Sequence, residues 1–486
     1  MISATSAFRI YKSPLTSRYT GAAMQELFGD QRKFTTWRIL WYKMAFCQHR
    51  LGVSRVTMPQ VEELERHVNI TDEEIRAAMA LEKTLKHDVV AHSQTYGVAC
   101  PLAAPIIHLA CTSMFVCDNT DLIIMRDGLD LLITKLVRCI DRMAKQAEKW
   151  AHLPTLGWTH LQPAQPTTVG KRIAIWMQDL VMDLEDLVSV RDGMKFLGAK
   201  GATGTQDSYL KLFGGDDEKV LQLDRMITNK CGFTYTMSAV CGQTYTRKVD
   251  AKILSVLGGI GSSIHKMMQD LRLLQHMKEI EEPFDESQVG SSAMAYKRNP
   301  MRSERACGLA RHSIMLPLEA LMTHATQMFE RTLDDSAPRR IYIPEAFLAA
   351  DATLTIVQNV FERLVVYPKM IQRNLAEELP FMATEDIIDA VVKVGKNRAE
   401  CHERLRVIAQ ESGRQVKEEG KDNPFIELIK ADPYFEDVTE VVGQALKGAN
   451  FIGRAPAQTR TFLNNEIRPV LNRYRDQLEG SSELRV

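Results

Sequence analysis

Three long runs of apolar residues at helical spacing constrain the fold of this chain more than any other feature. In the run from 246 to 280, apolar residues recur in steps of three and four, and the runs 167–196 and 121–150 repeat the pattern. Such stripes are longer than those of ordinary globular helices and must be buried against other helices. No strand-like alternation extends over a comparable length. The sequence therefore predicts an all-α protein with a central bundle of long helices.

The length of the chain indicates more than one domain, because 486 residues exceed what a single hydrophobic core usually holds. We predict an N-terminal helical domain over residues 1–111. A central long-helix bundle domain follows over 112–364, and a more polar helical domain over 365–486. Loops at the two ends of the bundle are where functional side chains are expected to gather.

The charge balance argues against some classes of partner. Lys and Arg together number 61, as do Asp and Glu, so the formal net charge is zero. Nucleic acids and anionic membranes both attract proteins with a basic excess. The stretch 89–117 has no charged residue, but its prolines and histidines make it a poor membrane span. We expect no nucleic-acid partner and no membrane partner, and we interpret this stretch as a buried segment beside an active site.

The cysteines indicate a reducing compartment. Their number is odd, nine, and none forms a Cys-x-x-Cys pair, so neither a disulfide framework nor a zinc site is expected. No secretory signal peptide is visible. The first 25 residues lack acids and contain three basic residues, which leaves a transit peptide as the alternative. We predict a cytoplasmic protein.

The segment 287–305 does not resemble a simple connector. Gly290 is followed by two serines, and six residues after Ser291 come Lys297, Arg298 and Asn299. Hydroxyl groups on a flexible loop, followed by donors that can hold carboxylates, are typical of a lid over an anionic substrate. The alternative is a solvated basic loop.

Three other polar segments are candidates for a site. The loop 157–168 contains His160 among polar residues and ends with two prolines before the next helix, and the segment 331–340 brings three arginines and a serine together. The second is either a charged surface loop or a phosphate clamp. Lys86-His87-Asp88 is placed at the end of a helix that begins at Thr71, and its histidine is too far from His92 for a shared metal.

The lid segment also carries a family resemblance. Gly290-Ser-Ser-Ala-Met-Ala-Tyr-Lys-Arg-Asn-Pro300 resembles the signature loop of the fumarase/aspartase superfamily, and with the following Met-Arg-Ser-Glu it is similar to the adenylosuccinate lyase family. Further matches lie at 86–88, 112–113, around His160, at Gln243 and at 331–340, so the resemblance covers most of residues 10–375. It implies a homotetramer with a 20-helix core and active sites shared between three subunits. An isolated chain would then be inactive.

The resemblance also implies a reaction without metal or cofactor. It is the β-elimination of fumarate from two small-molecule substrates, adenylosuccinate, which gives AMP, and SAICAR, which gives AICAR, in purine biosynthesis. Such chemistry needs a base, an acid for the departing nitrogen, and donors that stabilise a carbanion. The alternatives are another lyase of the superfamily, such as an argininosuccinate lyase, which needs no phosphate clamp, and a non-catalytic helical scaffold.

The resemblance assigns roles to individual residues. Ser291 would be the base and His160 the acid, Lys297 would stabilise the serine alkoxide, and Glu304 would orient His160. The substrate-binding residues implied in this way are Arg18, Tyr19, Lys86, His87, Asp88, Thr112, Ser113, Gln243, Asn299, Arg305, Arg331, Ser336 and Arg340.

Overall fold

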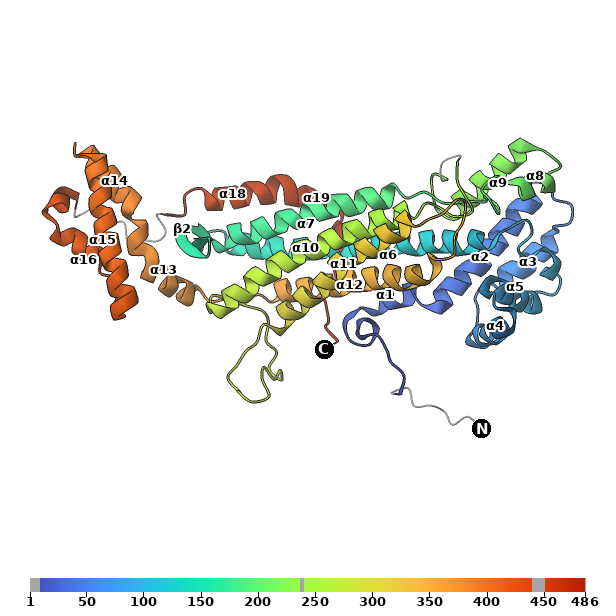
Figure 1. Ribbon diagram of the computed structural model, residues 1–486, viewed down its shortest axis with the longest axis horizontal. Coiled ribbons are helices and arrows are strands. Elements are labelled where there is room, and N and C mark those ends of the chain that lie inside the picture. Colours follow the sequence, from blue (N-terminus) through green and yellow to red (C-terminus); the bar gives the residue numbers. More distant parts are fainter. Residues whose placement is uncertain (1–8, 237–239, 439–450, 486) are drawn as a thin grey trace.

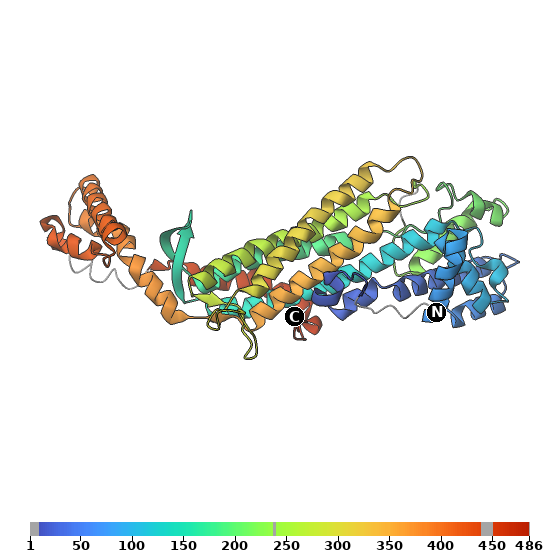
Figure 2. The same ribbon diagram turned by 60° about the horizontal axis from the view of Figure 1, so that its bottom comes forward.

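The computed structural model describes residues 9–236, 240–438 and 451–485 and consists mainly of helices. Five long helices lie side by side and form the central bundle (Figures 1 and 2). They are α6 (Ser113–Lys149), α7 (Val169–Asp192), α10 (Lys248–His276), α11 (Met301–Ala325) and α12 (Ser336–Glu362). The three predicted stripes correspond to α6, α7 and α10, so the all-α bundle is confirmed. The longest described helix is α6, with 37 residues, against 29 in α10.

A group of shorter helices covers one end of the bundle, at the right of Figure 1. It comprises α2 (Asp30–Arg50), α3 (Met58–Arg66), α4 (Asp72–Leu85), α5 (Asp88–Ala99), η3 (Ala104–Ile106), α8 (Asp207–Leu212) and α9 (Asp217–Lys230). The predicted helix start at Thr71 is confirmed, because its side chain accepts a hydrogen bond from the Glu74 N–H in a capping box. The short elements η2 (Leu15–Tyr19) and α1 (Ala22–Leu27) lie along the bundle itself.

The C-terminal part of the chain divides between two places. The helices α13 (Pro368–Met382), α14 (Thr384–Lys393), α15 (Arg398–Glu419), α16 (Phe425–Ala431) and η4 (Pro433–Val438) extend beyond the opposite end of the bundle. Ile387, Phe425 and Phe435 form a separate hydrophobic core there. The chain then returns to the bundle through α18 (Ala455–Phe462), η6 (Leu463–Ile467), α19 (Arg468–Arg473) and η7 (Arg475–Gln477), and Leu463 and Ile467 join the main core.

The segment that the sequence analysis interpreted as a loop around His160 is a β-hairpin. Strand β1 (Pro154–Thr159) pairs antiparallel with β2 (Gln162–Thr168). Prolines are tolerated in β2 because both strands of an isolated hairpin are edge strands. Gly157 lies at an irregularity in the register, where a Cβ atom would approach the Gln165 carbonyl oxygen to 2.3 Å. A second pairing joins β3 (Ile280–Glu281) to β4 (Val365–Val366).

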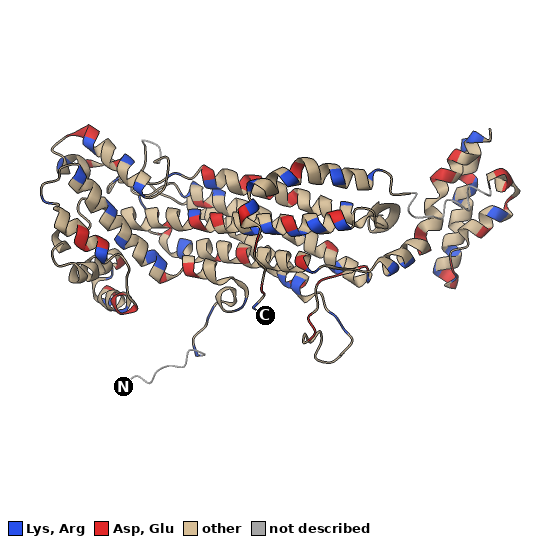
Figure 3. Ribbon diagram, turned by 180° about the vertical axis from the view of Figure 1, so that it is seen from behind, with Lys and Arg blue, Asp and Glu red and all other residues tan. Residues whose placement is uncertain are grey.

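The surface charges agree with a net charge of zero. Figure 3 shows acidic and basic residues interspersed along the helices. None of the described helices combines the length and apolarity needed to cross a bilayer.

The core at the N-terminal end contains a buried histidine that should make stability depend on pH. His92 is 3% exposed and stacks on Phe34, with 3.8 Å between ring centroids. Burial, assisted by the charges of Arg38 and Lys33, lowers the pKa of His92 from 6.5 to about 4. As the pH falls below 6.5, His92 therefore becomes protonated in the unfolded chain but stays neutral in the folded chain. Stability is lost in that direction.

Lowering the pH from 7 to 5 should cost about 2 kcal/mol of unfolding free energy through this residue alone. His92→Phe keeps an aromatic ring and removes the titrating group, so its urea midpoint should fall less between the two pH values. His402→Phe, at an exposed position, is the matched control. An equal fall of the urea midpoint in wild type and His92→Phe would show that His92 does not cause the loss of stability.

Candidate functional site

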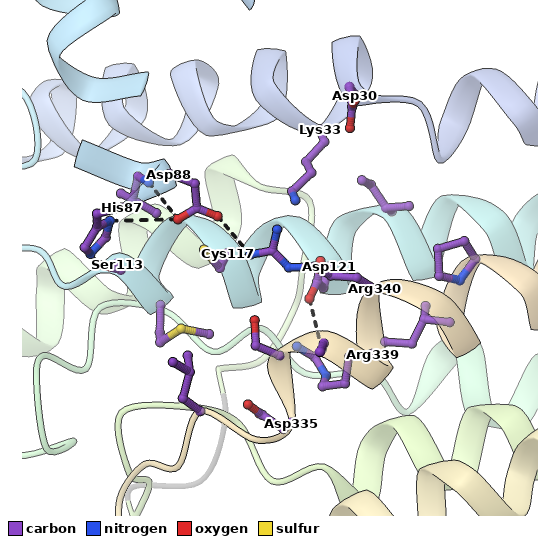
Figure 4. A pocket seen from close by; sticks show the side chains of 18 of the residues that line it. Asp30, Lys33, His87, Asp88, Ser113, Cys117, Asp121, Asp335, Arg339 and Arg340 are labelled. Carbon is purple, nitrogen blue, oxygen red and sulfur yellow. Dashed lines mark hydrogen bonds and ion pairs between the residues drawn. The ribbon is translucent and has the colours of Figure 1, made fainter. Parts of the chain in front are cut away.

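A cavity of about 870 Å³ opens where the N-terminal helices meet the ends of α6 and α12. Figure 4 shows its wall, with side chains from α2, α5, α6 and α12 facing a common space. Eight of the residues implied by the family resemblance line it: Lys86, His87, Asp88, Ser113, Gln243, Arg331, Ser336 and Arg340. Residues separated by more than 250 positions in the chain are thus brought to one place.

His87 lies at the start of a helix and not at the end of one, which corrects the sequence interpretation. Lys86 ends α4 in the left-handed conformation with φ 56°, and the chain turns there. His87 is then the N-cap of α5, and its Nδ1 accepts a hydrogen bond from the Val90 N–H at 3.3 Å. A neutral ring with Nδ1 as acceptor carries its proton on Nε2, which lies 3.3 Å from the Ser113 Oγ. The imidazole is therefore oriented toward the cavity wall.

Asp88 and Arg340 form an ion pair across the cavity (Figure 4). The Arg340 Nη2 donates to the Asp88 Oδ2 at 2.9 Å, and the other carboxylate oxygen accepts from the Val89 N–H. Burial by itself would raise the pKa of Asp88, but the guanidinium of Arg340 lowers it overall. The carboxylate holds an exposed arginine in place over the opening, where the arginine can meet an anionic ligand.

The N-terminal end of α12 also faces the cavity. Asp335, Ser336 and Ala337 line it, so the positive end of the helix dipole is directed toward an anion in this space. Asp335 is 1% exposed and accepts from the Arg331 Nη1 at 2.5 Å. Arg331, Arg340 and the N-terminal end of α12 therefore line the same cavity, and such groups are suited to binding a phosphate group.

A buried network of charges beneath the cavity was not found by the sequence analysis. Arg247, completely buried, donates to Asp118 on α6 at 3.0 Å and to Asp335 at 2.6 Å. Arg339, also buried, donates to Asp250 of α10 at 2.7 Å. The network ties α6, α10 and α12 together, and two of its members, Asp335 and Arg339, also line the cavity. Its only signal in the sequence was the presence of acids within apolar helical stripes.

Two of the residues implied to bind the succinyl group are placed by neighbouring backbone. Thr112 is the N-cap of α6, next to Ser113. The Gln243 side chain donates to the Ala202 carbonyl oxygen at 3.0 Å, and its backbone N–H donates to the Glu330 carbonyl oxygen. The glycine-rich segment 201–206 thus supports Gln243.

Three other implied residues form a second group. The guanidinium carbon of Arg305 lies 5.4 Å from the centre of the Tyr19 ring, and that of Arg18 lies 6.0 Å from it. Tyr19 and Arg18 come from η2, and Arg305 from the first turns of α11. The group lies at the base of the loop that carries Ser291.

That loop, residues 286–300, projects from the bundle between α10 and α11 (Figures 1 and 2). The Ser291 Oγ accepts from the backbone N–H groups of Ala293 at 3.3 Å and Met294 at 3.2 Å. Asn299 donates to the Gly290 carbonyl oxygen at 2.8 Å. Gly290 is required, because a Cβ atom would lie 2.0 Å from the Lys297 carbonyl oxygen.

His160 lies apart from both groups. It occupies the tip of the hairpin, where it and Leu161 have φ values of 56° and 55°, as a two-residue turn with left-handed residues requires. The hairpin follows the C-terminal end of α6, whereas Ser113 begins that helix. The 37 residues of α6 make a rod about 55 Å long. Within one chain, His160 and the cavity are therefore far apart.

The expected contact between Glu304 and His160 is likewise not formed within one chain. Glu304 is exposed and lies 4.0 Å from Arg272. In the part of the chain that the structure describes, no cluster of His, Cys, Asp and Glu is arranged to hold a metal ion.

Comparison with known proteins gives consistent matches over nearly the whole chain. Residues 61–314 match a family model described as a lyase, and residues 380–462 match one described as the adenylosuccinate lyase C-terminus. The chain is 48% identical to the adenylosuccinate lyase of Schizosaccharomyces pombe, with 96% of this chain and 97% of the relative covered. It is 47% identical to that of Schistosoma mansoni, with 99% of both chains covered.

Solved structures share the fold. The 3-carboxy-cis,cis-muconate lactonizing enzyme of Pseudomonas putida superposes with a TM-score of 0.79 at 21% identity, covering 93% of this chain and 98% of the other. A fumarate lyase from Mesorhizobium also gives 0.79 at 19% identity, covering 94% and 100%.

Proposed function

The chain belongs to the adenylosuccinate lyase family, and from this premise we propose that it catalyses the β-elimination of fumarate from adenylosuccinate, yielding AMP. We extend the proposal to SAICAR, yielding AICAR, because both substrates share a ribose phosphate and a succinyl-amine. The observation that carries the choice of a nucleotide substrate is that Arg331, Arg340 and the α12 N-terminus line the same cavity. A lyase for argininosuccinate would need no such phosphate site.

The base in this proposal is Ser291. Its Oγ already accepts two backbone N–H groups, which would also stabilise the alkoxide that proton abstraction requires. Lys297 on the same loop adds a positive charge that favours the alkoxide and holds a succinyl carboxylate. Closure of the loop would exclude water and strengthen both effects. No metal or organic cofactor takes part in these steps.

The remaining roles follow the chemistry of the substrate. His160 protonates the departing nitrogen, and Glu304 orients its imidazole. Asn299, Thr112, Ser113 and Gln243 bind the succinyl carboxylates. Arg331, Ser336, Arg340 and His87 bind the phosphate and ribose, with Lys86 and Asp88 in the same wall, while Arg18, Tyr19 and Arg305 complete the nucleotide site.

A shared active site is supported by the separation of these groups. The acid His160, the base Ser291 and the cavity lie at three different places of one chain. The length of α6 separates His160 from the cavity. Different copies of the chain must then supply them. Exposed apolar side chains along the bundle favour such an assembly, for instance Met182 at 61%, Met315 at 62% and Leu318 at 55% exposure. We propose a homotetramer in which three subunits contribute to each site.

The wider setting is part of the same proposal. The enzyme would act in purine nucleotide biosynthesis in the cytoplasm, where nine unpaired cysteines would stay reduced. We keep the division into domains 1–111, 112–364 and 365–486, with the bundle as the middle domain.

The direct test is fumarate release by the purified protein from adenylosuccinate, SAICAR and argininosuccinate. We expect turnover of the first two and none of the third. Turnover of argininosuccinate alone would make the chain a different lyase, and turnover of only one nucleotide would restrict the substrate. A verified tetramer that releases no fumarate from any of them would support the scaffold alternative.

The phosphate site gives a separate prediction. Arg340→Met removes a charged donor to the phosphate and should raise KM for adenylosuccinate about tenfold or more, with a smaller effect on kcat. Competitive inhibition by AMP should weaken to a similar extent. Arg404→Met, which removes an arginine of α15 that is paired with Glu400 and with Asp432 at the end of α16, is the control. An unchanged KM would place the phosphate elsewhere.

A further inference from the structure

The C-terminal residues 478–485 form a strap that runs back along α6 and α12 and ends between two parts of the proposed active site. In both ribbon views the C-terminal end lies near η2 and the base of the projecting loop (Figures 1 and 2). This strap lies more than 100 residues beyond α12 in the sequence.

The strap is fixed to the bundle mainly through its backbone. Arg142 of α6 donates to the Leu478 carbonyl oxygen at 3.0 Å and to that of Gly480 at 2.8 Å. Gln358 of α12 donates to the same Gly480 carbonyl oxygen at 3.1 Å. Leu484 packs against the main core. These contacts hold the strap in one path across the bundle.

At one point the strap connects to the base of the loop that carries Ser291. The Asn359 Nδ2 donates to the Ser482 carbonyl oxygen at 2.9 Å, while its Oδ1 accepts from the Arg302 Nη1 at 2.7 Å. Arg302 is buried and donates through Nη2 to Asp285 at 2.5 Å. Asp285 lies where the chain leaves β3 for the loop. A single amide thus joins the strap to the arginine that anchors the loop.

At its far end the strap reaches the N-terminal turn. The Arg485 Nη1 donates to the Thr16 carbonyl oxygen at 2.9 Å. Thr16 belongs to η2, which also carries Arg18 and Tyr19, and Tyr19 lies against Arg305. The strap therefore contacts η2 directly and reaches the start of α11 only through Asn359 and Arg302.

We propose that the C-terminal strap positions the catalytic loop through Asn359 and the nucleotide-binding turn through Arg485. This inference rests on the proposed function for its kinetic consequences, but the contacts themselves do not. Asn359 and Arg485 are positioning residues in this arrangement, because each acts through a group that binds substrate or carries the base. The two contacts should affect different kinetic constants. The contact at Ser482 supports the loop that carries the base and should affect kcat, whereas the contact at Arg485 supports the turn that binds the nucleotide and should affect KM.

Two single substitutions separate the ends. Asn359→Asp keeps the oxygen that accepts from Arg302 but cannot donate to the Ser482 carbonyl oxygen, so kcat should fall about fivefold with KM nearly unchanged. Arg485→Met loses the bond to the Thr16 carbonyl oxygen, so KM should rise about fivefold with kcat nearly unchanged. Arg485→Lys, which retains a donor, should restore part of the loss. Arg473→Met, an exposed position on α19, controls for the loss of a charge.

Hydrogen exchange measured on the intact tetramer gives a readout independent of activity. Residues 286–300 should exchange faster in Asn359→Asp and residues 15–20 faster in Arg485→Met, while the control exchanges like wild type. Unchanged exchange and kinetics in both variants would overturn the proposal. So would a joint fall of kcat, affinity and melting temperature, which would indicate a general structural role. If wild type released no fumarate, the proposed function would fail while the exchange result still decided the role of the strap.

Discussion

Replacing Ser291 with alanine should lower kcat for fumarate release from adenylosuccinate by about a thousandfold, with KM changed only a few fold. The hydroxyl oxygen is the proposed acceptor of the proton next to the carboxylate, and alanine offers no atom in its place. The loss falls on kcat because the base makes its decisive interaction in the transition state and contributes little to ground-state binding.

The geometry of the loop explains why this serine and not its neighbour should be the base. The Ser291 Oγ accepts two backbone N–H groups, from Ala293 and Met294, which would stabilise negative charge on that atom. Ser292 is exposed, and within the described part of the chain its hydroxyl forms no hydrogen bond, so Ser292→Ala is the matched control. It should keep kcat within a few fold of wild type. The reverse result, with Ser291→Ala active and Ser292→Ala inactive, would transfer the role to Ser292.

Mixing two inactive variants should restore activity if copies of the chain share their active sites. Ser291→Ala and His160→Ala should each be nearly inactive as homotetramers. In randomly mixed tetramers about a quarter of the sites would combine an intact serine from one subunit with an intact histidine from another. Activity should therefore rise more than a hundredfold, from about a thousandth of the wild-type value toward a quarter of it.

The matched control for this experiment pairs two variants on the same loop. Ser291→Ala mixed with Lys297→Ala should regain nothing, because both residues come from one segment of one subunit. Recovery of activity in this second mixture would mean that Ser291 and Lys297 of one active site can come from different subunits, which contradicts their assignment to one loop. No recovery in the first mixture, with subunit exchange verified, would mean that one chain supplies both groups and that a rearrangement brings the hairpin with His160 to the loop with Ser291.

The helices of the bundle could be predicted because their signal is local. In α6, α7 and α10 the apolar residues recur at the period of the helix, and every turn contributes to the pattern. The hairpin around His160 was missed because Pro163 and Pro166 argue against a strand, and a two-stranded hairpin with only edge strands does not obey that rule. Gly157, read as a loop residue, is instead a position where two backbones approach too closely for a side chain.

The candidate site residues were predicted from a motif and a family resemblance. Neither of these predicted which of the residues lie together in space. Nothing in the spacing of Asp88 and Arg340 indicates an ion pair across a cavity, because the contact joins residues 252 positions apart. Arg247 and Asp118 were overlooked for a related reason. A charged residue in a polar stretch and one in a buried network look the same in a sequence, and only the surrounding packing distinguishes them.

Long packed helices and the residues of a lyase signature could both be predicted from the sequence, because each depends on residues that lie close together along the chain. Which of those residues meet in space depends on how the helices pack. Rigid helices carry their ends far apart, so α6 separates His160 from Ser113 by its whole length, while the packing of α12 against α6 brings Arg340 to Asp88 at the start of α5. Distance along a sequence does not set distance in space once helices are packed side by side.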